Sequence, residues 1–129
     1  MLAQEMADGK NKQDQLEKFN LEERTAKFGE DVISFCLNLP KNEITKPLIT
    51  QLVKAATSIG ANYCEADNAE SKKDFKHKIA ISKKEAKESK HFLRMVGQAV
   101  SQEKNEAQKL WTEAKELTLI FNSIYNKVK

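Results

Sequence analysis

The sequence predicts an all-α protein, an antiparallel up-down-up-down four-helix bundle. The 129 residues include only four glycines and two prolines, whereas a sandwich or barrel needs turn residues at short, regular intervals. Four long segments carry apolar residues at the spacing of a helix that buries one face. The links between them are short, so neighbouring helices should run antiparallel. We expect the bundle to occupy residues 16–129, after a flexible, polar N-terminal arm of residues 1–15 that lacks a sustained period.

The first helix is expected over residues 20–39. Asn20 is a favourable N-cap, and Glu23 three residues later fits a capping box. Pro40 ends the helix because its ring cannot continue the hydrogen-bond ladder. At 100° per residue, five apolar side chains of this segment fall within one narrow arc. They are Leu21, Phe28, Val32, Phe35 and Leu39.

The second helix is expected over residues 46–68. Thr45 is a suitable N-cap, and Pro47 lies in the first turn, where its missing N–H costs nothing. The apolar residues of this segment cover about half of the circumference, more than the ~100° needed to face one core. A central, well-buried helix or a contact with another subunit would each explain this width. The set is Leu48, Ile49, Leu52, Val53, Ala55, Ala56, Ile59, Tyr63 and Ala66.

The third and fourth helices are expected over residues 71–101 and 103–127. Ser71 with Asp74 three residues later forms an Asp variant of the capping box at the start of the third helix. Small residues on the inner face of that helix predict a close approach to a neighbour: Ser82, Ala86 and Ser89. The inner face of the fourth helix is Leu110, Ala114, Leu117, Phe121, Ile124, Tyr125 and Val128, with Trp111 at its edge.

Basic charge is concentrated on the third helix. The formal net charge is +3, but residues 71–100 carry nine Lys and Arg against three acids, and the rest of the chain carries 13 against 16. A net +6 on one helix is therefore set against −3 elsewhere. Six of these cations fall within about 60° of arc, beside the core face of the helix. We call this set the basic stripe: Lys72, Lys76, Lys83, Lys87, Lys90 and Arg94.

The basic stripe has three possible explanations. Like charges at i, i+4 repel, so acids on a neighbouring helix or an anionic partner should offset the repulsion. A nucleic-acid backbone would do so, and such binding would be sequence-independent and salt-sensitive. The alternatives are a solvated face that serves solubility, or ion pairs with another subunit or a protein partner. Because no aromatic residue interrupts the stripe, base stacking is not expected.

No catalytic, metal or cofactor site is expected. Glu88 and His91 have the Glu-x-x-His spacing of di-iron bundles, but such sites need this motif on two helices. His77 lies on the same helix as His91, about 21 Å away along its axis, so the two cannot share a metal. Glycine-rich phosphate loops and nucleophile elbows are absent from the sequence. Cys36 and Cys64 have no metal or redox spacing and are interpreted as small buried hydrophobes.

Several blocks of the sequence also carry a family resemblance. They are residues 57–66 (TSIGANYCEA), 71–75, 83–89, 21–28 and 117–121. These blocks are similar to the small four helix bundle protein family, also called the 23S rRNA intervening-sequence protein family. The resemblance covers nearly all of the expected bundle domain and leaves only the arm outside it.

This resemblance implies a bacterial protein that folds as an antiparallel four-helix bundle and assembles as a homopentamer. In a pentamer, part of the broad apolar face of the second helix would be buried against another subunit. No catalytic residues are assigned to the family. A related branch, the accessory variability proteins of diversity-generating retroelements, forms basic pentamers that engage nucleic acid and a reverse transcriptase.

We therefore expect a non-enzymatic, oligomeric, cytoplasmic protein that contacts nucleic-acid phosphates, of RNA rather than DNA, through the basic stripe. The alternative is a structural or adaptor protein that binds a protein partner, with the lysines serving solubility or subunit pairing. Apolar runs in the sequence are too short to span a membrane, so no membrane association is expected.

Overall fold

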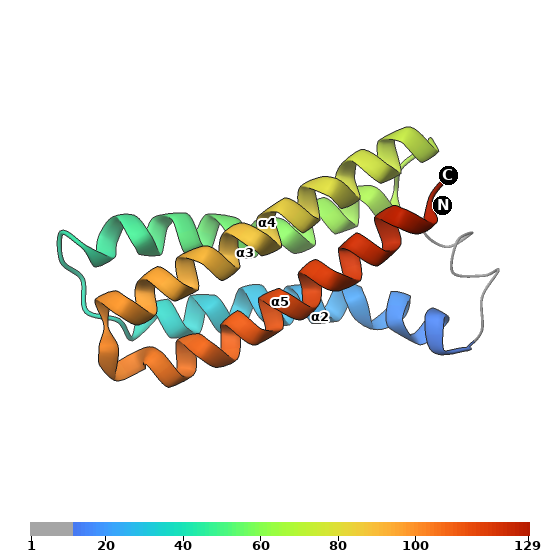
Figure 1. Cartoon of the computed structure of the whole chain (residues 1–129). Coiled ribbons are helices and arrows are strands. Elements are labelled where there is room, and N and C mark those ends of the chain that lie inside the picture. The colour runs from blue at the N-terminus through green and yellow to red at the C-terminus, as the bar shows by residue number, and fades with distance from the viewer. Residues whose placement is uncertain (1–11) are drawn as a thin grey trace.

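The four predicted helices are present in the computed structural model, which describes the backbone of residues 12–129 and the side chains of residues 21–129. The elements are α2 (Lys12–Leu37), α3 (Thr45–Asp67), α4 (Lys72–Ala99), a 3₁₀ turn η1 (Ser101–Glu103) and α5 (Lys104–Lys127). Within the described part no strand occurs. The connections alternate between the two ends of the molecule, so consecutive helices run antiparallel (Figure 1). The predicted all-α four-helix bundle is confirmed.

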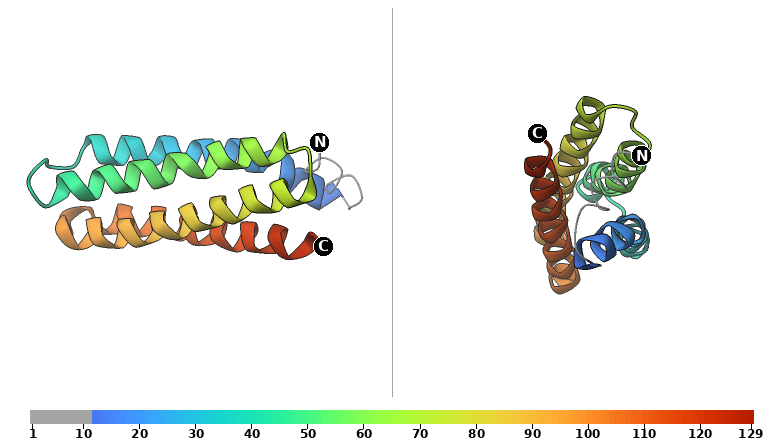
Figure 2. Two further views of the ribbon diagram at one scale, coloured as in Figure 1. Left: turned by 90° about the horizontal axis from the view of Figure 1, so that it is seen from above. Right: turned by 90° about the vertical axis from the view of Figure 1, so that its right-hand side faces the viewer.

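The helices form two layers, one of α2 and α3 and one of α4 and α5 (Figure 2). Extensive contacts join α3 to α4 and α4 to α5, whereas α2 packs mainly on α3 and touches α5 over a smaller area. Helix α4 is therefore held along both flanks, with its remaining face directed away from the other helices.

The core consists mainly of the predicted apolar faces, although Ile124 and Tyr125 of α5 are only half-buried. The predicted inner residues of the first helix are all buried, including Leu39 just beyond the end of α2, and Phe28 and Val32 are at most 1% exposed. The rings of Tyr63 from α3 and Phe121 from α5 meet with centroids 6.0 Å apart. Packing within the chain covers most of the broad face of α3, because six of its nine apolar residues are buried. The other three, Leu48, Ile49 and Val53, are half-buried.

Small residues allow the helices to approach closely at two places. Ser82, Ala86 and Ser89 of α4 are fully buried, as their spacing predicted. The Ser82 hydroxyl donates a hydrogen bond of 3.1 Å to the carbonyl oxygen of Ile59 in α3. A β-carbon added at Gly60 would lie 3.0 Å from Oγ1 of Thr25 in α2. This glycine therefore permits the close approach of α2 and α3, because a β-carbon here would require Thr25 to shift by a few tenths of an ångström.

The predicted start of α4 is confirmed, whereas that of α3 is wrong in detail. The Ser71 hydroxyl accepts a hydrogen bond of 3.0 Å from the Asp74 amide, as in a capping box. Thr45 is the first residue of α3 and not its N-cap. The capping oxygen belongs to Asn42, whose Oδ1 accepts the amides of Ile44 and Thr45 at 2.9 Å each. The Thr45 hydroxyl instead closes the preceding loop by donating to the Pro40 carbonyl at 2.6 Å.

The predicted start of the first helix at Asn20 is also wrong, because α2 already begins at Lys12. Residues 12–19 contain neither glycine nor proline, and each residue added to an existing helix gains a hydrogen bond at little nucleation cost. Propagation therefore outweighs the capping preference of Asn20. Residues 12–15 of the predicted arm are thus helical, and residues 1–11 lie outside the described part of the chain. The other helix ends agree with the predicted ones to within three residues.

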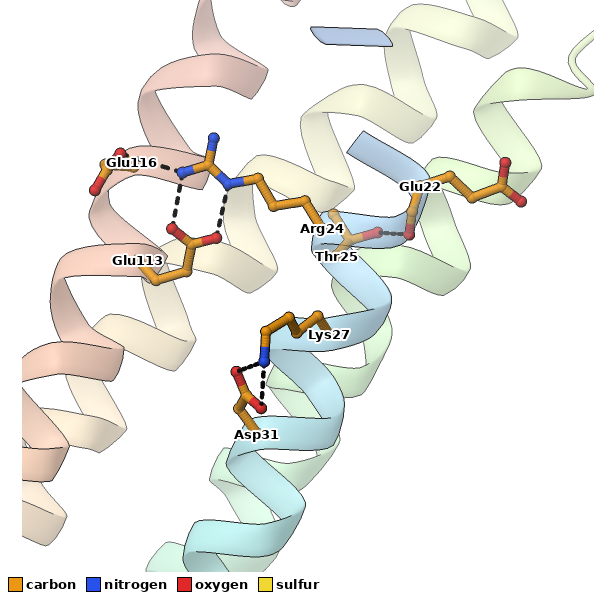
Figure 3. A network of polar contacts seen from close by, with 7 residues as sticks. All are labelled: Glu22, Arg24, Thr25, Lys27, Asp31, Glu113 and Glu116. Atoms are coloured by element: carbon orange, nitrogen blue, oxygen red, sulfur yellow. Dashed lines mark hydrogen bonds and ion pairs between the residues drawn. The ribbon is translucent and has the colours of Figure 1, made fainter. Parts of the chain in front are cut away.

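Helix α2 is tied to α5 by an arginine that the sequence analysis did not single out. Arg24 donates from Nε to Oε2 of Glu113 at 2.7 Å and from Nη2 to Oε1 at 2.8 Å, a two-pronged pair (Figure 3). The same Nη2 reaches Oε1 of Glu116 at 3.1 Å. The hydrogen bond with Glu113 raises the pKa of Arg24 above its usual value. These contacts connect the two helices where apolar packing between them is sparse.

Candidate nucleic-acid interface

The basic stripe lies on α4 and divides into two rows. Lys72, Lys87 and Arg94 are exposed and form what we call the outer row. Lys76, Lys83 and Lys90 are half-buried and form the inner row, beside α5. The positions of the six cations around the helix axis could not reveal this difference in exposure. Which of them are covered depends on where the neighbouring helix packs.

The inner row rests on aromatic rings of α5. The Lys76 and Lys83 ammonium groups lie 4.5 Å and 5.5 Å from the ring centroid of Tyr125. Lys83 also donates to Oδ1 of Asn122 at 3.2 Å, and Lys90 lies 5.4 Å from the ring of Trp111. Such cation–π contacts offset part of the repulsion along the stripe. Both rings come from α5, so the sequence of α4 alone contained no sign of them.

The basic stripe has no described acidic partner on the neighbouring helices. Among residues 21–129, none of its six cations forms a salt bridge. The ion pair between α3 and α4 joins Glu65 to Lys78, which lies off the stripe, at 3.0 Å. The outer row is exposed and has no salt bridge to residues 21–129, which suits it to an external anion.

A shallow hollow of about 560 Å³ borders the stripe on its α3 side. Lys83, Lys84 and Lys87 line it together with Glu88 and His91. The Glu88 carboxylate places one negative charge among these cations. Burial raises the pKa of the neighbouring Glu85, and repulsion from Glu88 adds to this effect.

Comparison with known proteins identifies the family. The family described as 23S rRNA-intervening sequence protein matches residues 17–123, most of the chain. The chain belongs to this family. A protein of unknown function from the S23 ribosomal protein family of Bacteroides thetaiotaomicron VPI-5482 has a similar crystal structure, with a TM-score of 0.71 and 23% sequence identity. The similarity covers 81% of this chain and 96% of that one, and it supports the shared fold. Among curated proteins, none matches this chain.

In this 23S rRNA-intervening sequence family member, the two cysteines are free and differ in environment. Cys36 is 4% exposed, and burial raises the pKa of its thiol to about 11. Cys64 is exposed, which corrects the expectation that both are buried, because it follows Tyr63 on the side of α3 turned away from the core. Desolvation still raises the Cys64 pKa, as do Glu22 and Asp67. Both environments disfavour the thiolate, which is the nucleophilic form.

Among the side chains of residues 21–129, no group of three or more His, Cys, Asp and Glu could hold a metal ion. Within residues 12–129, no helix combines the length and the apolar character needed to cross a membrane.

Proposed function

We propose that this family member is a non-enzymatic, cytoplasmic RNA-binding protein whose basic stripe contacts phosphates. The observation that carries the proposal is the outer row of Lys72, Lys87 and Arg94, three exposed cations without a described salt-bridge partner on one helix. Lysine and arginine bind the phosphate backbone through charge, with little regard to sequence. The outer row makes the direct contacts, and the inner row adds to the positive potential of the same face.

The salt dependence of RNA binding tests this proposal. Each phosphate contact on a single strand contributes about −0.7 to the slope of log affinity against log salt concentration. Contact by the outer row alone, or by all six cations, gives a slope of roughly −2 to −4. We expect affinity to fall roughly 20- to 300-fold between about 50 mM and about 200 mM salt. Fluorescence anisotropy with a labelled RNA measures this, and tight binding that ignores salt would contradict the proposal.

The proposal includes a homo-oligomer, with the pentamer as the form that the family resemblance implies. Half-buried Leu48, Ile49 and Val53 supply apolar surface for a subunit contact. Five copies would carry a formal charge of about +15 and present five basic stripes together. Light scattering at micromolar concentration is the direct check, and a mass equal to one chain would contradict this part.

A second candidate function is that of an adaptor for a protein partner. Three large apolar side chains are exposed near the link between α2 and α3: Ile33 at 41%, Leu37 at 74% and Ile44 at 65%. In this case the lysines would serve solubility or subunit pairing. A pull-down that retains one defined protein after nuclease treatment, and no RNA, would favour the adaptor.

A further inference from the structure

A second hollow, of about 510 Å³, lies where the end of α4 meets the beginning of α5. It continues the basic stripe, because the last stripe residue, Arg94, forms part of its wall. Gly97 is one of the residues that line it, and a β-carbon there would stand 3.6 Å from Cβ of Ala107. The polar and aromatic residues around it are Arg94, Gln98, Lys104, Gln108 and Trp111.

The residues around this hollow match the chemistry of a nucleotide. Trp111 offers a flat aromatic surface that is only half-buried, and any nucleobase can stack on such a surface. The amides of Gln98 and Gln108 each carry donors and an acceptor, which suits the polar edge of a base. Arg94 and Lys104 supply the positive charge that a phosphate requires. All four polar residues are exposed and accessible to a ligand.

Two further observations favour this hollow over the one beside α3. No carboxylate lines it, whereas Glu88 borders the other and would repel a phosphate. Trp111 also adjoins the stripe itself, because the ammonium group of Lys90 lies 5.4 Å from its ring centroid. The ammonium group of Lys115, on α5, lies 5.8 Å from the same centroid. An RNA strand bound along the stripe would therefore pass beside the indole ring of Trp111.

We propose that this hollow binds one unpaired nucleotide of an RNA strand, with its base stacked on Trp111 and its phosphates on Arg94 and Lys104. The proposal rests on the proposed function, because the stripe must hold the rest of the strand. It makes unpaired RNA the preferred ligand over a continuous duplex, in which the bases are stacked on each other and unavailable.

The chain contains a single tryptophan, so its fluorescence reports directly on this hollow. The probes are a short oligouridine and a blunt RNA duplex of equal length, both labelled for anisotropy. Oligouridine is expected to quench Trp111 emission with the same midpoint as its anisotropy curve. If oligouridine binds and leaves the emission unchanged, the nucleotide site is overturned and the proposed function stands. If neither RNA binds, the nucleotide site and the proposed function are both overturned.

Substitution gives a second, independent readout. Trp111→Leu is expected to lower the ratio of oligouridine to duplex affinity by roughly 5- to 150-fold, the range of one lost base–aromatic stack. Trp111→Phe keeps a ring and should lower that ratio less. Circular dichroism confirms that each variant is folded. The double variant Gln98→Ala with Gln108→Ala alters only exposed positions and should lower the ratio in the same direction. An unchanged ratio in both the Trp111→Leu and the double variant would overturn the proposal.

Discussion

Replacing all three outer-row cations by glutamate, as Lys72→Glu, Lys87→Glu and Arg94→Glu, is expected to weaken RNA binding by about 100-fold or more. A hydrogen bond to a charged group contributes about 1.5–3 kcal/mol when its partner is present, and each reversed charge also repels the phosphate that it formerly bound. The slope of log affinity against log salt concentration should become less negative by about 2, because three phosphate contacts are lost. Anisotropy with the same labelled RNA at several salt concentrations measures both quantities.

The matched control reverses three exposed lysines on other helices: Lys46 and Lys54 of α3 and Lys109 of α5. This variant has the same net charge as the outer-row variant, so any difference between them reports on position. It should lose only a small part of its affinity, through the weaker overall field. Equal losses in the two variants would mean that general charge, and not the stripe, attracts the RNA.

Phe121→Ala is expected to lower the free energy of unfolding by about 3–5 kcal/mol. The Phe121 side chain is 0% exposed and meets the ring of Tyr63 across the core. Truncation removes the transfer free energy of the ring and leaves a cavity, which α3 and α5 can close only in part. Urea unfolding followed by circular dichroism gives the value, with the m-value showing whether unfolding remains two-state.

Leu119→Ala is the control for this stability measurement. Leu119 lies two residues away on the same helix but is 59% exposed. Its truncation should change the free energy of unfolding by no more than about 0.5 kcal/mol. If Phe121→Ala lowered the free energy of unfolding as little as Leu119→Ala, the face of α5 that carries Phe121 would not be packed in the core.

The helices and their inner faces could be predicted because the signal for them is local. Residues that repeat every three or four positions, such as Phe28, Val32 and Phe35, reach the core wherever the helix is placed. Ser71 could be recognised as a cap for the same reason, since its partner is only three residues away. The start of α2 could not be predicted, because the capping preference of Asn20 and the propagation of the helix act on the same short segment.

The contacts that shape the candidate site are not local. Whether Lys76 meets Tyr125, or Lys90 meets Trp111, depends on the register and rotation of α4 against α5. The pair of Arg24 and Glu113 is separated by 89 residues and depends in the same way on how α2 meets α5. The sequence therefore indicated which helix is basic, but not which of its lysines are exposed or that an aromatic hollow lies at its end.

The position of α4 between α3 and α5 has a consequence for the thermodynamics of binding. A helix held along both flanks has already lost its backbone freedom in the free protein, so a ligand on its outer face need only restrict lysine and arginine rotamers. The surface is thus preorganised. Because the stripe exists only when α4 is docked, RNA bound there also opposes unfolding of the whole bundle, by about 2.7 kcal/mol at a free RNA concentration one hundred times the Kd.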